Sequence, residues 1–385
     1  MNSIPPLDLT QQYETISDEV NAAVLAVLAS GQYINGPIVA DFEQQFAQYI
    51  GTTECVTCNS GTDALFLAMR AYGIGPGDEV ITTPFTFFAT AEMVTAVGAT
   101  PVFVDIDPDT FNLNLDLIEA AITPRTKAIA PVHLFGQPVD MTRLMAIARK
   151  HSLLVIEDCA QATGATWQGQ RVGSIGHIGC FSFFPTKNLG ACGDGGAITT
   201  NDSVIAAKIR MLREHGSRQR YYHEAIGTTS RLDALQAAIL RIKLQRLDQW
   251  NAQRRAVAAY YSQLLTPLPN LVTPTVIPGG EHTWHQYTIR LTATDGQTTR
   301  DGKVRDRVKS FLQAQGISSM IYYPVPLHQQ AVYQSLNYQP GQLPVVEQVA
   351  HEVLSLPMFP ELTPEQQERI VYALKDSRDQ GMFSP

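Results

Sequence analysis

One lysine in this sequence stands in a setting that favours chemistry over solvation. Lys187 follows an aromatic segment, 181–184, and precedes a glycine-rich stretch, 190–196. Lysine side chains normally seek water, and an ammonium group that is stripped of water by burial loses proton affinity. The neutral amine is then a nucleophile toward a carbonyl group such as an aldehyde. The alternative is a lysine at a strand end whose stem is covered while its charge reaches solvent.

Acidic and amide side chains follow another apolar run, 153–156. They are Glu157, Asp158 and Gln161. Four consecutive apolar residues of this type indicate a buried strand, and the residues before Lys187 read in the same way. The two carboxylates, the amide and the lysine are therefore each expected just beyond the end of a strand.

The elements that position these groups alternate between strands and helices along the first 213 residues. Predicted strands cover 55–58, 79–83, 101–105, 128–132, 153–156, 179–184 and 197–200, and predicted helices cover 18–28, 39–50, 63–72, 89–97, 114–122, 140–151 and 203–213. This alternation predicts an α/β fold with a mostly parallel central sheet that is covered on both faces. Ligands of such sheets bind beyond the carboxyl ends of the strands, so the groups above are expected to meet there.

A turn of small residues, 59–62, connects the first predicted strand to a helix. Its residues Ser60, Gly61 and Thr62 precede free N–H groups and the positive end of the helix dipole, which suits a phosphate. The simpler interpretation is that Ser60 or Thr62 only caps the helix. Aromatic residues, among them Phe87, follow the strand at 79–83.

Pyridoxal phosphate requires the same set of groups. It needs a lysine for its aldehyde, a carboxylate for its pyridine nitrogen, donors for its phosphate and a flat side chain against its ring. Each feature alone is a weak signal, but the convergence of all four on one sheet edge predicts a pyridoxal phosphate enzyme.

The second half of the chain is expected to form a different unit. The segment 214–229 is polar and without helical period, which is typical of a functional loop, a subunit contact or a solvated surface loop. Ser230 resembles the N-cap of a helix that runs to about residue 250. Beyond it, strands at 285–291 and 318–323 around a helix at 304–315 predict a smaller α+β lobe, which divides the chain into a large cofactor domain, 1–250, and a small domain, 251–385.

Composition excludes several functions and partners. The net charge of −8 and the lack of a dense basic cluster argue against a nucleic-acid partner. No apolar run approaches a membrane span and the start lacks a signal-peptide pattern, so we expect a cytoplasmic protein without membrane contact. Cys55 and Cys58 have the spacing of a metal or redox pair, but nothing completes a four-ligand site. For all five cysteines, Cys55, Cys58, Cys159, Cys180 and Cys192, we predict buried free thiols and no metal.

The sequence resembles the DegT/StrS family of pyridoxal phosphate-dependent nucleotide-sugar aminotransferases, which adopt the aspartate aminotransferase-like (type I) fold. The likeness runs nearly end to end. The motifs that carry it lie at 31–34, 59–65, 75–81, 157–158, 182–187, 193–196 and 354–357. Related dehydratases have histidine in place of the lysine, so the presence of Lys187 favours transamination.

The resemblance implies roles for individual residues. Lys187 would bind the cofactor covalently and later carry a proton, Asp158 would pair with the pyridine nitrogen, and Gln161 would contact the ring hydroxyl or stack nearby. Phe87 would cover the ring. The residues placed at the phosphate are Ser60, Gly61, Thr62, Ser182 and, from the neighbouring subunit of a homodimer, Thr229. The family usually has asparagine at this last position, and a threonine hydroxyl reaches less far.

The resemblance also bears on the substrates. The segment from Tyr322 and Tyr323 to His328, whose side chains could bind a sugar or serve only as surface aromatics and a capping histidine, is similar to that of members that aminate 3-keto sugars. Glutamate is the expected amino donor, and UDP-2-acetamido-2-deoxy-3-oxo-glucuronate the expected acceptor. Arg231 is then a candidate partner for the sugar carboxylate, although it suits any anionic group.

Two alternatives remain. One is a dTDP-linked 3-oxo-6-deoxyhexose as the acceptor. The other is a non-catalytic regulatory relative, which the acidic charge and the lack of a helix-turn-helix signal oppose.

Overall fold

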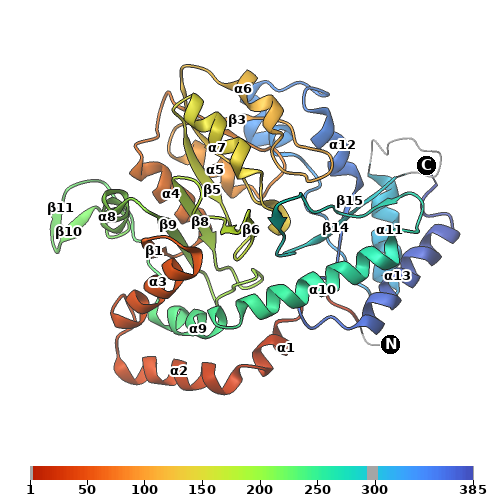
Figure 1. Ribbon diagram of the computed structural model, residues 1–385, viewed down its shortest axis with the longest axis horizontal. Helices are drawn as coiled ribbons and strands as arrows, with labels where there is room; N and C mark the ends of the chain where they lie inside the picture. The colour runs from red at the N-terminus through yellow and green to blue at the C-terminus, as the bar shows by residue number, and fades with distance from the viewer. Residues whose placement is uncertain (1–2, 293–301, 385) are drawn as a thin grey trace.

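A seven-stranded sheet forms the centre of the larger part of the computed structural model, which describes residues 3–292 and 302–384 (Figure 1). Its strand order is β1-β9-β8-β5-β4-β2-β3. The strands are β1 (Glu54–Cys58), β2 (Glu79–Thr82), β3 (Thr100–Phe103), β4 (Thr126–Ala130), β5 (Leu154–Asp158), β8 (Ile178–Ser182) and β9 (Gly196–Thr200). From β8 to β3 all neighbours are parallel, while β9 is antiparallel to both β8 and β1. The predicted mostly parallel α/β sheet is confirmed.

The described helices lie around this sheet and in a second lobe (Figure 1). They are α1 (Leu9–Glu14), α2 (Ser17–Ser30), α3 (Pro37–Ile50), α4 (Gly61–Ala71), α5 (Ala89–Ala96), α6 (Ile118–Ala121), α7 (Met141–Lys150), α8 (Ser203–Leu212), α9 (Ala234–Leu244), α10 (Leu247–Leu265), α11 (Lys303–Ala314), α12 (Pro344–Glu352) and α13 (Pro364–Asp379). The helix expected at 114–122 is shorter, since it begins as the 3-10 turn η1 (Leu115–Leu117) and continues as α6.

The period of two along β8 explains why helices cover both faces of the sheet. Ile178 and Cys180 pack with residues of α4 and α8, while Phe181 packs with residues of α3 and α9. Successive side chains of a strand point to opposite faces, so one short apolar strand serves two cores. The end of β8 is thereby held from both sides, and the loop that carries Lys187 starts from a fixed point.

The helix expected from Ser230 to about residue 250 is divided into two, so that prediction was wrong. The Ser230 hydroxyl donates to Asn59 Oδ1 at 3.2 Å, and it is therefore not the N-cap. Asp233 holds that position without a side-chain hydrogen bond, and α9 begins at Ala234. The helix ends at Leu244 and α10 begins at Leu247.

A three-stranded antiparallel sheet supports the second lobe. Its order is β12 (Leu271–Val272), β14 (Tyr287–Leu291) and β15 (Val353–Leu356). Residues from α10, α11 and α13 pack with it in one core, which also includes Ile4 near the start of the chain. The predicted division at residue 250 falls within α10, which runs between the two parts of the molecule (Figure 1), and it stays a prediction.

The strand expected at 318–323 does not form. Only Met320 pairs, in an isolated bridge with Ser355. The chain then leaves the sheet toward Pro324 and Pro326, which have no N–H to donate to a ladder. The helix predicted at 304–315 is present as α11, and the strand predicted at 285–291 is present from Tyr287 as β14.

The polar segment 214–229 contains a hairpin that projects from the molecule. Its strands are β10 (Ser217–Gln219) and β11 (Tyr222–His223), at the far left of Figure 1. A further small sheet joins β13 (Gly280–Glu281), β6 (Thr166–Trp167) and β7 (Gln170–Arg171).

All five cysteines are free, and four of them are buried as predicted. Cys192 is exposed, so the prediction was wrong for this residue. Within residues 3–292 and 302–384, no helix combines the length and the apolarity that crossing a membrane requires.

The aromatic cluster behind β8 provides a test of this arrangement. Phe46 of α3 is fully buried, and its ring centroid lies 5.0 Å from Phe181 and 5.3 Å from Phe183 in edge-to-face geometry. Replacing Phe46 by alanine should lower the free energy of unfolding by about 3 to 5 kcal/mol, because a cavity remains where the ring was. Urea denaturation followed by circular dichroism measures this loss.

The control is Tyr372→Ala on α13, where the ring is 72% exposed. This change should alter the free energy of unfolding by no more than about 0.5 kcal/mol. A similar small effect for both variants would contradict the role assigned to the aromatic cluster.

Candidate active site

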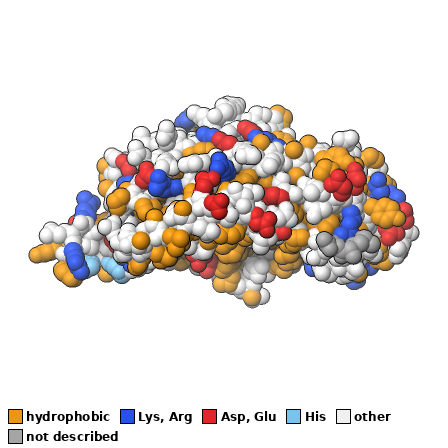
Figure 2. Space-filling model, turned by 90° about the horizontal axis from the view of Figure 1, so that it is seen from below, with side chains coloured by type: hydrophobic (Ala, Val, Ile, Leu, Met, Phe, Trp, Pro, Cys, Tyr) orange, Lys and Arg blue, Asp and Glu red, His pale blue; other side chains and the backbone are white. Residues whose placement is uncertain are grey.

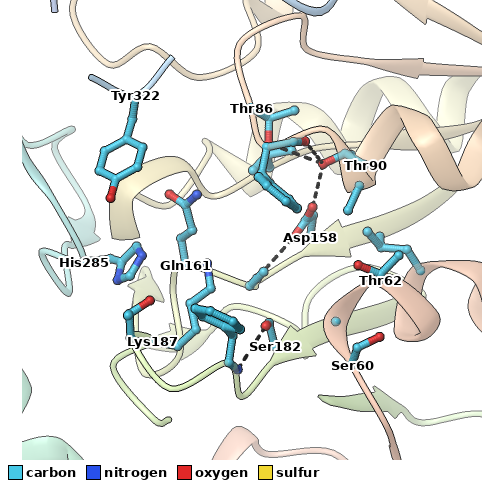
Figure 3. Close-up of a pocket in the computed structure, with 18 of the residues that line it drawn as sticks. Ser60, Thr62, Thr86, Thr90, Asp158, Gln161, Ser182, Lys187, His285 and Tyr322 are labelled. Atoms are coloured by element: carbon cyan, nitrogen blue, oxygen red, sulfur yellow. Dashed lines mark hydrogen bonds between the residues drawn. The ribbon is translucent and has the colours of Figure 1, made fainter. Parts of the chain in front are cut away.

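A pocket of about 400 Å³ opens where the parallel strands β5 and β8 end (Figure 3). Its volume lies within the range of small-molecule sites, and its place is the one expected for ligands of such sheets. Most of the residues singled out in the sequence lie in its wall. These are Ser60, Gly61, Thr62, Phe87, Asp158, Gln161, Ser182, Lys187, Tyr322 and Tyr323.

Lys187 stands in the loop that leaves β8. Its backbone N–H donates to Phe184 O at 2.9 Å, and the loop closes where Ala191 N–H donates to Phe183 O at 2.7 Å. Burial of the ammonium group lowers the pKa of Lys187 to about 8, and the charge of Asp158 opposes this shift. A fraction of the molecules therefore carries a neutral, nucleophilic amine near neutral pH.

Asp158 is the last residue of β5, and both its backbone and its side chain are held. Its N–H donates to Pro131 O at 2.9 Å. The Thr90 hydroxyl donates to Oδ2 at 2.8 Å, and Ala160 N–H donates to Oδ1 at 3.1 Å. Burial raises the pKa of Asp158, while these two donors oppose the rise. The carboxylate is thus short of water and suited to a cationic or N–H partner.

The start of α4 forms a cradle at one side of the pocket. Ser60 is its N-cap and accepts from Asp63 N–H at 3.1 Å, so the capping role is present. The first N–H groups of a helix, here those of Gly61 and Thr62, lack partners within the helix and attract an anion. A Cβ atom on Gly61 would lie 2.6 Å from Cβ of Ser182. Only glycine therefore allows the helix to approach the end of β8 this closely.

Gln161 is fixed in one orientation. Its Oε1 accepts from Phe135 N–H at 2.8 Å, and its Nε2 donates to the Tyr323 hydroxyl at 2.9 Å. The amide therefore links the large part of the chain to the segment from the second lobe. Phe87 also belongs to the wall and is 59% exposed, so part of its ring is free to cover a planar ligand.

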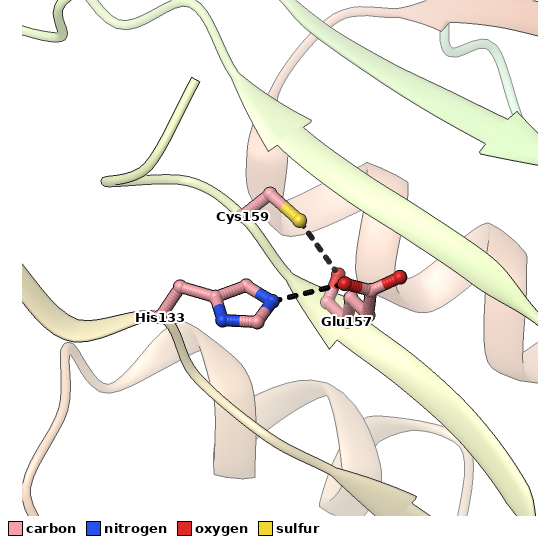
Figure 4. A group of neighbouring side chains, drawn as sticks. All are labelled: His133, Glu157 and Cys159. Carbon is pink, nitrogen blue, oxygen red and sulfur yellow. Dashed lines mark hydrogen bonds and ion pairs between the residues drawn. The ribbon is translucent and has the colours of Figure 1, made fainter. Parts of the chain in front are cut away.

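Glu157 does not reach the pocket, although the sequence suggested that both carboxylates would lie there. It is fully buried, and His133 lies 3.0 Å from its Oε2 (Figure 4). Its carboxylate also accepts from the N–H groups of Gly173, Ile175 and Gly176 at 2.6 to 3.0 Å. The alternation of side chains along β5 explains this, since neighbours on a strand point to opposite faces.

His133, Glu157 and Cys159 lie close enough together to suggest a metal site. Val139 N–H donates to His133 Nδ1 at 3.1 Å, so the ring proton is on Nε2, which donates to Glu157. Burial raises the pKa of the Cys159 thiol well above its usual value. The imidazole and the carboxylate are committed to hydrogen bonds and the sulfur stays protonated, so we assign this cluster a structural role.

Three residues from the sequence prediction lie outside the pocket wall. Arg231 Nη1 is 3.6 Å from Glu214 Oε2, and the Thr229 hydroxyl contacts His215 Nε2. The His328 side chain is buried, with Nε2 3.4 Å from Glu347 Oε1. Within this single chain, none of the three faces the space between Lys187 and Asp158.

The pocket also contains residues that the sequence reasoning missed. The Thr90 hydroxyl donates to Asp158. Thr186, which precedes Lys187 in the chain, and His285 also belong to the wall. Thr90 follows the aromatic segment beyond β2, and the rule that ligands bind at strand ends could have identified it. His285 comes almost one hundred residues after Lys187 and two residues before the start of β14, and no local pattern indicates that it returns to this site.

The residues present fit pyridoxal phosphate. The amine of Lys187 is desolvated, the cradle at Gly61 accepts an anion, and the Asp158 carboxylate lies in the same pocket. Lys187 would hold the aldehyde carbon, Asp158 the pyridine nitrogen, and Ser182 with the start of α4 the phosphate. The cofactor would supply an electron sink to this site.

The close approach at Gly61 predicts the effect of one methyl group. In a Gly61→Ala variant the new Cβ displaces either α4 or the end of β8, so the affinity for pyridoxal phosphate should fall about tenfold or more, or at least about 1.4 kcal/mol. Visible absorbance during titration with the cofactor measures this. In the control, Gly75→Ala, the new Cβ would lie 3.6 Å from Val97 O, and the affinity should not change. Equal affinity in both variants would place the phosphate elsewhere.

The hydrogen bond from Thr90 predicts a pH effect. In Thr90→Val the Asp158 carboxylate loses a donor that stabilises its charge, so its pKa rises further. Because the ionised carboxylate would keep the pyridine nitrogen protonated, the acid-side transition in the visible spectrum of the bound cofactor should move to higher pH. Thr90→Ser keeps the hydroxyl and should keep the wild-type transition. A valine variant with an unmoved transition would show that the donor has no such effect.

Three comparisons with known proteins agree with this geometry. A model of the DegT/DnrJ/EryC1/StrS aminotransferase family matches residues 14–375. The chain is 50% identical to a protein named pleiotropic regulatory protein from Geobacillus stearothermophilus, over 96% of this chain and 97% of that protein. It is 49% identical to UDP-N-acetyl-3-dehydro-alpha-D-glucosamine 3-aminotransferase from Acidithiobacillus ferrooxidans, over 97% of each chain.

A further relative and a solved structure come from Streptomyces venezuelae. The relative, dTDP-3-amino-3,4,6-trideoxy-alpha-D-glucose transaminase, is 46% identical over 97% of this chain and 96% of its own length. The structure, DesV in complex with a ketimine intermediate, superposes with a TM-score of 0.93 at 45% identity over 98% of both chains. The chain therefore belongs to the DegT/DnrJ/EryC1/StrS family of aminotransferases, which depend on pyridoxal phosphate.

Proposed function

We propose that the protein transfers an amino group from an amino acid, L-glutamate in the first instance, to C3 of a nucleotide-linked 3-keto sugar. The two half-reactions use one pocket in turn. The observation that supports this most directly is the pairing of a desolvated lysine amine with a buried carboxylate in a pocket of about 400 Å³. A structural lysine would not need such an environment.

Each residue has a defined task in this proposal. Lys187 Nζ would take a proton from the substrate carbon that bears the amino nitrogen and deliver it to the carbon on the other side of that nitrogen, which its pKa of about 8 allows near neutral pH. Asp158 keeps the pyridine nitrogen protonated, and the hydroxyl of Thr90 keeps Asp158 ionised. Gln161 and Tyr323 close the pocket from the side of the second lobe.

The name of the Geobacillus relative raises the question of a regulatory role for this chain. The presence of Lys187 and Asp158 in one desolvated pocket favours catalysis. Burial of two charged groups costs desolvation free energy, which a catalytic role for both groups explains. The net charge of −8 also opposes a DNA-binding role.

A homodimer with shared sites explains the residues that lie outside the pocket. Arg231 and Thr229 do not line the pocket of their own chain, and we propose that they complete the site of a second copy. The nearby segment 214–229 carries Tyr221, Tyr222 and Ile226, which are 78%, 66% and 82% exposed. Figure 2 shows hydrophobic side chains at this projecting end. Exposed apolar groups of this size favour burial against another chain.

The acceptor is proposed as UDP-2-acetamido-2-deoxy-3-oxo-glucuronate, with a dTDP-linked 3-oxo-6-deoxyhexose as the second candidate. Relatives named for UDP-linked and dTDP-linked sugars match at 49% and 46% identity, which supports the class of 3-keto sugars for either nucleotide. Arg231 is the proposed partner of the uronic carboxylate, since a guanidinium group binds carboxylates in bidentate fashion. We place the reaction in the cytoplasm, where thiols such as Cys55 and Cys58 stay reduced.

Replacement of Lys187 tests the proposed activity. The purified protein should show visible absorbance from bound cofactor that changes on addition of glutamate, and Lys187→Ala should abolish both this change and the transfer to 3-keto sugars. Lys150→Ala, at a side chain that is 65% exposed, should retain both. Acceptors with UDP or dTDP, each with and without a uronic carboxylate, are compared by the ratio of kcat/KM. No transfer to any member of this panel would contradict the proposal.

A mixture of two inactive variants tests the shared site. Lys187→Ala and Arg231→Ala each damage a different part of the composite pocket, so a dimer that contains one chain of each type has one intact site. Co-expression with two affinity tags isolates this mixed dimer, whose activity should reach about half that of the wild type, because it has one of two sites. A mixed dimer as inactive as its parents would show that Arg231 acts within its own chain.

A further inference from the structure

His285 lies in the pocket wall, and neither the sequence nor the proposed roles explain its imidazole ring there. The residue is 7% exposed and belongs to the pocket wall. Figure 3 shows its ring at the same end of the pocket as Lys187, below Tyr322. Its backbone is fixed, because His285 N–H donates to Phe135 O at 2.8 Å. The chemistry of the ring depends on which of its two nitrogens carries the proton.

The hydrogen bonds around Asn188 determine the direction of every proton in this network. Asn188 Nδ2 donates to Thr283 O at 2.9 Å and to Asn251 Oδ1 at 2.8 Å. Asn251 Nδ2 in turn donates to Thr163 O at 3.1 Å. The two backbone carbonyls can only accept, so neither amide can be turned around without placing oxygen against oxygen.

The fixed amide of Asn188 selects one tautomer of His285. Asn188 Oδ1 lies 3.2 Å from His285 Nδ1 and has only lone pairs to offer, so Nδ1 carries the hydrogen. Among residues 3–292 and 302–384, Asn188 is the only hydrogen-bonding partner of the ring. Nε2 therefore carries a lone pair that accepts no hydrogen bond from the described residues. Burial lowers the pKa of His285 well below its usual value, and the charge of Lys187 adds to this effect, so the ring stays neutral.

Lys187 is the group that gains most from a neutral acceptor at this place. Its ammonium group has three hydrogens to donate, and burial makes this charged form costly. A second carboxylate would offset the cost but would hold the proton too firmly for transfer. A neutral imidazole lone pair offsets part of it and leaves the proton mobile.

We propose that His285 is a further catalytic residue, whose Nε2 lone pair accepts a hydrogen bond from the Lys187 ammonium group when Lys187 is released by the amine form of the cofactor and carries a proton. We propose further that Asn188 is the positioning residue that holds this tautomer. The inference deepens the proposed function and rests on it for the proton transfer. No proton moves onto His285, and the proton that Lys187 takes from one carbon is the one that it returns. The lysine and the residue that orients its acceptor are adjacent in one loop, so they keep their positions together.

The tautomer is tested by nitrogen NMR of protein labelled with ¹⁵N-histidine, with the cofactor bound in its amine form, which leaves Lys187 free. His285→Gln assigns the signals by their loss. We expect a protonated Nδ1 and an unprotonated Nε2 throughout the neutral pH range. A ring with the opposite tautomer, or one that becomes cationic in this range, would overturn the proposal. This measurement does not depend on transaminase activity, so it stays informative even if the proposed reaction were wrong.

The interaction with Lys187 is tested by the pH dependence of its acetylation with acetic anhydride, read by peptide mass spectrometry on the same amine form. His285→Phe keeps a ring but removes the acceptor, so the proton affinity of Lys187 should fall about tenfold, which is about one pKa unit. His285→Gln keeps an acceptor oxygen and should remain much closer to the wild type. Circular dichroism and cofactor content confirm folding. An unchanged Lys187 titration in the phenylalanine variant would overturn the proposal. Should that variant not fold, a tenfold fall in the proton affinity of Lys187 in His285→Gln, as large as the loss of every acceptor predicts, would overturn it as well.

Discussion

The removal of water from two opposite charges at one sheet edge is the constraint on which the site depends. Burial lowers the pKa of Lys187 to about 8 and raises that of Asp158, so each group is moved toward its neutral form. Two effects oppose this shift. The two charges attract each other, and Asp158 accepts hydrogen bonds from the Thr90 hydroxyl and the Ala160 N–H. The balance leaves a lysine that can react beside a carboxylate whose charge is stabilised by its donors. In water the same lysine would be almost entirely protonated near neutral pH.

Such a balance requires rigid support, which aromatic packing and a buried carboxylate provide in different ways. Behind β8, Phe46 packs edge to face with Phe181 and Phe183 and fixes the start of the lysine loop. At the end of β5, Glu157 takes three backbone N–H groups and His133, so the residue before Asp158 is anchored away from the pocket. A satisfied buried carboxylate of this kind holds a strand end more firmly than apolar packing alone, because its hydrogen bonds are directional.

The sequence predicted the scaffold well because the parallel strands are continuous apolar runs and their polar followers meet at one edge. Lys187, Asp158, Gln161 and the turn at Gly61 were found by that rule, and all line the pocket. The same rule wrongly placed Glu157 in the pocket. The alternation of side chains along a strand would have separated it from Asp158. The cap assigned to Ser230 failed because a hydroxyl can bond to a distant residue, here Asn59. His285 was missed because it reaches the pocket from the second lobe, and only tertiary structure brings it there.

The connection between the two lobes passes through the loop that carries the lysine. Asn188 joins Asn251 of α10 and Thr283, which immediately precedes the segment with His285. Gln161 makes a second link, to Tyr323. A displacement of the second lobe would therefore break hydrogen bonds at the lysine loop itself, where buried donors and acceptors are costly to leave unpaired. It follows that both half-reactions, with an amino acid and with a much larger sugar nucleotide, use one fixed arrangement around Lys187.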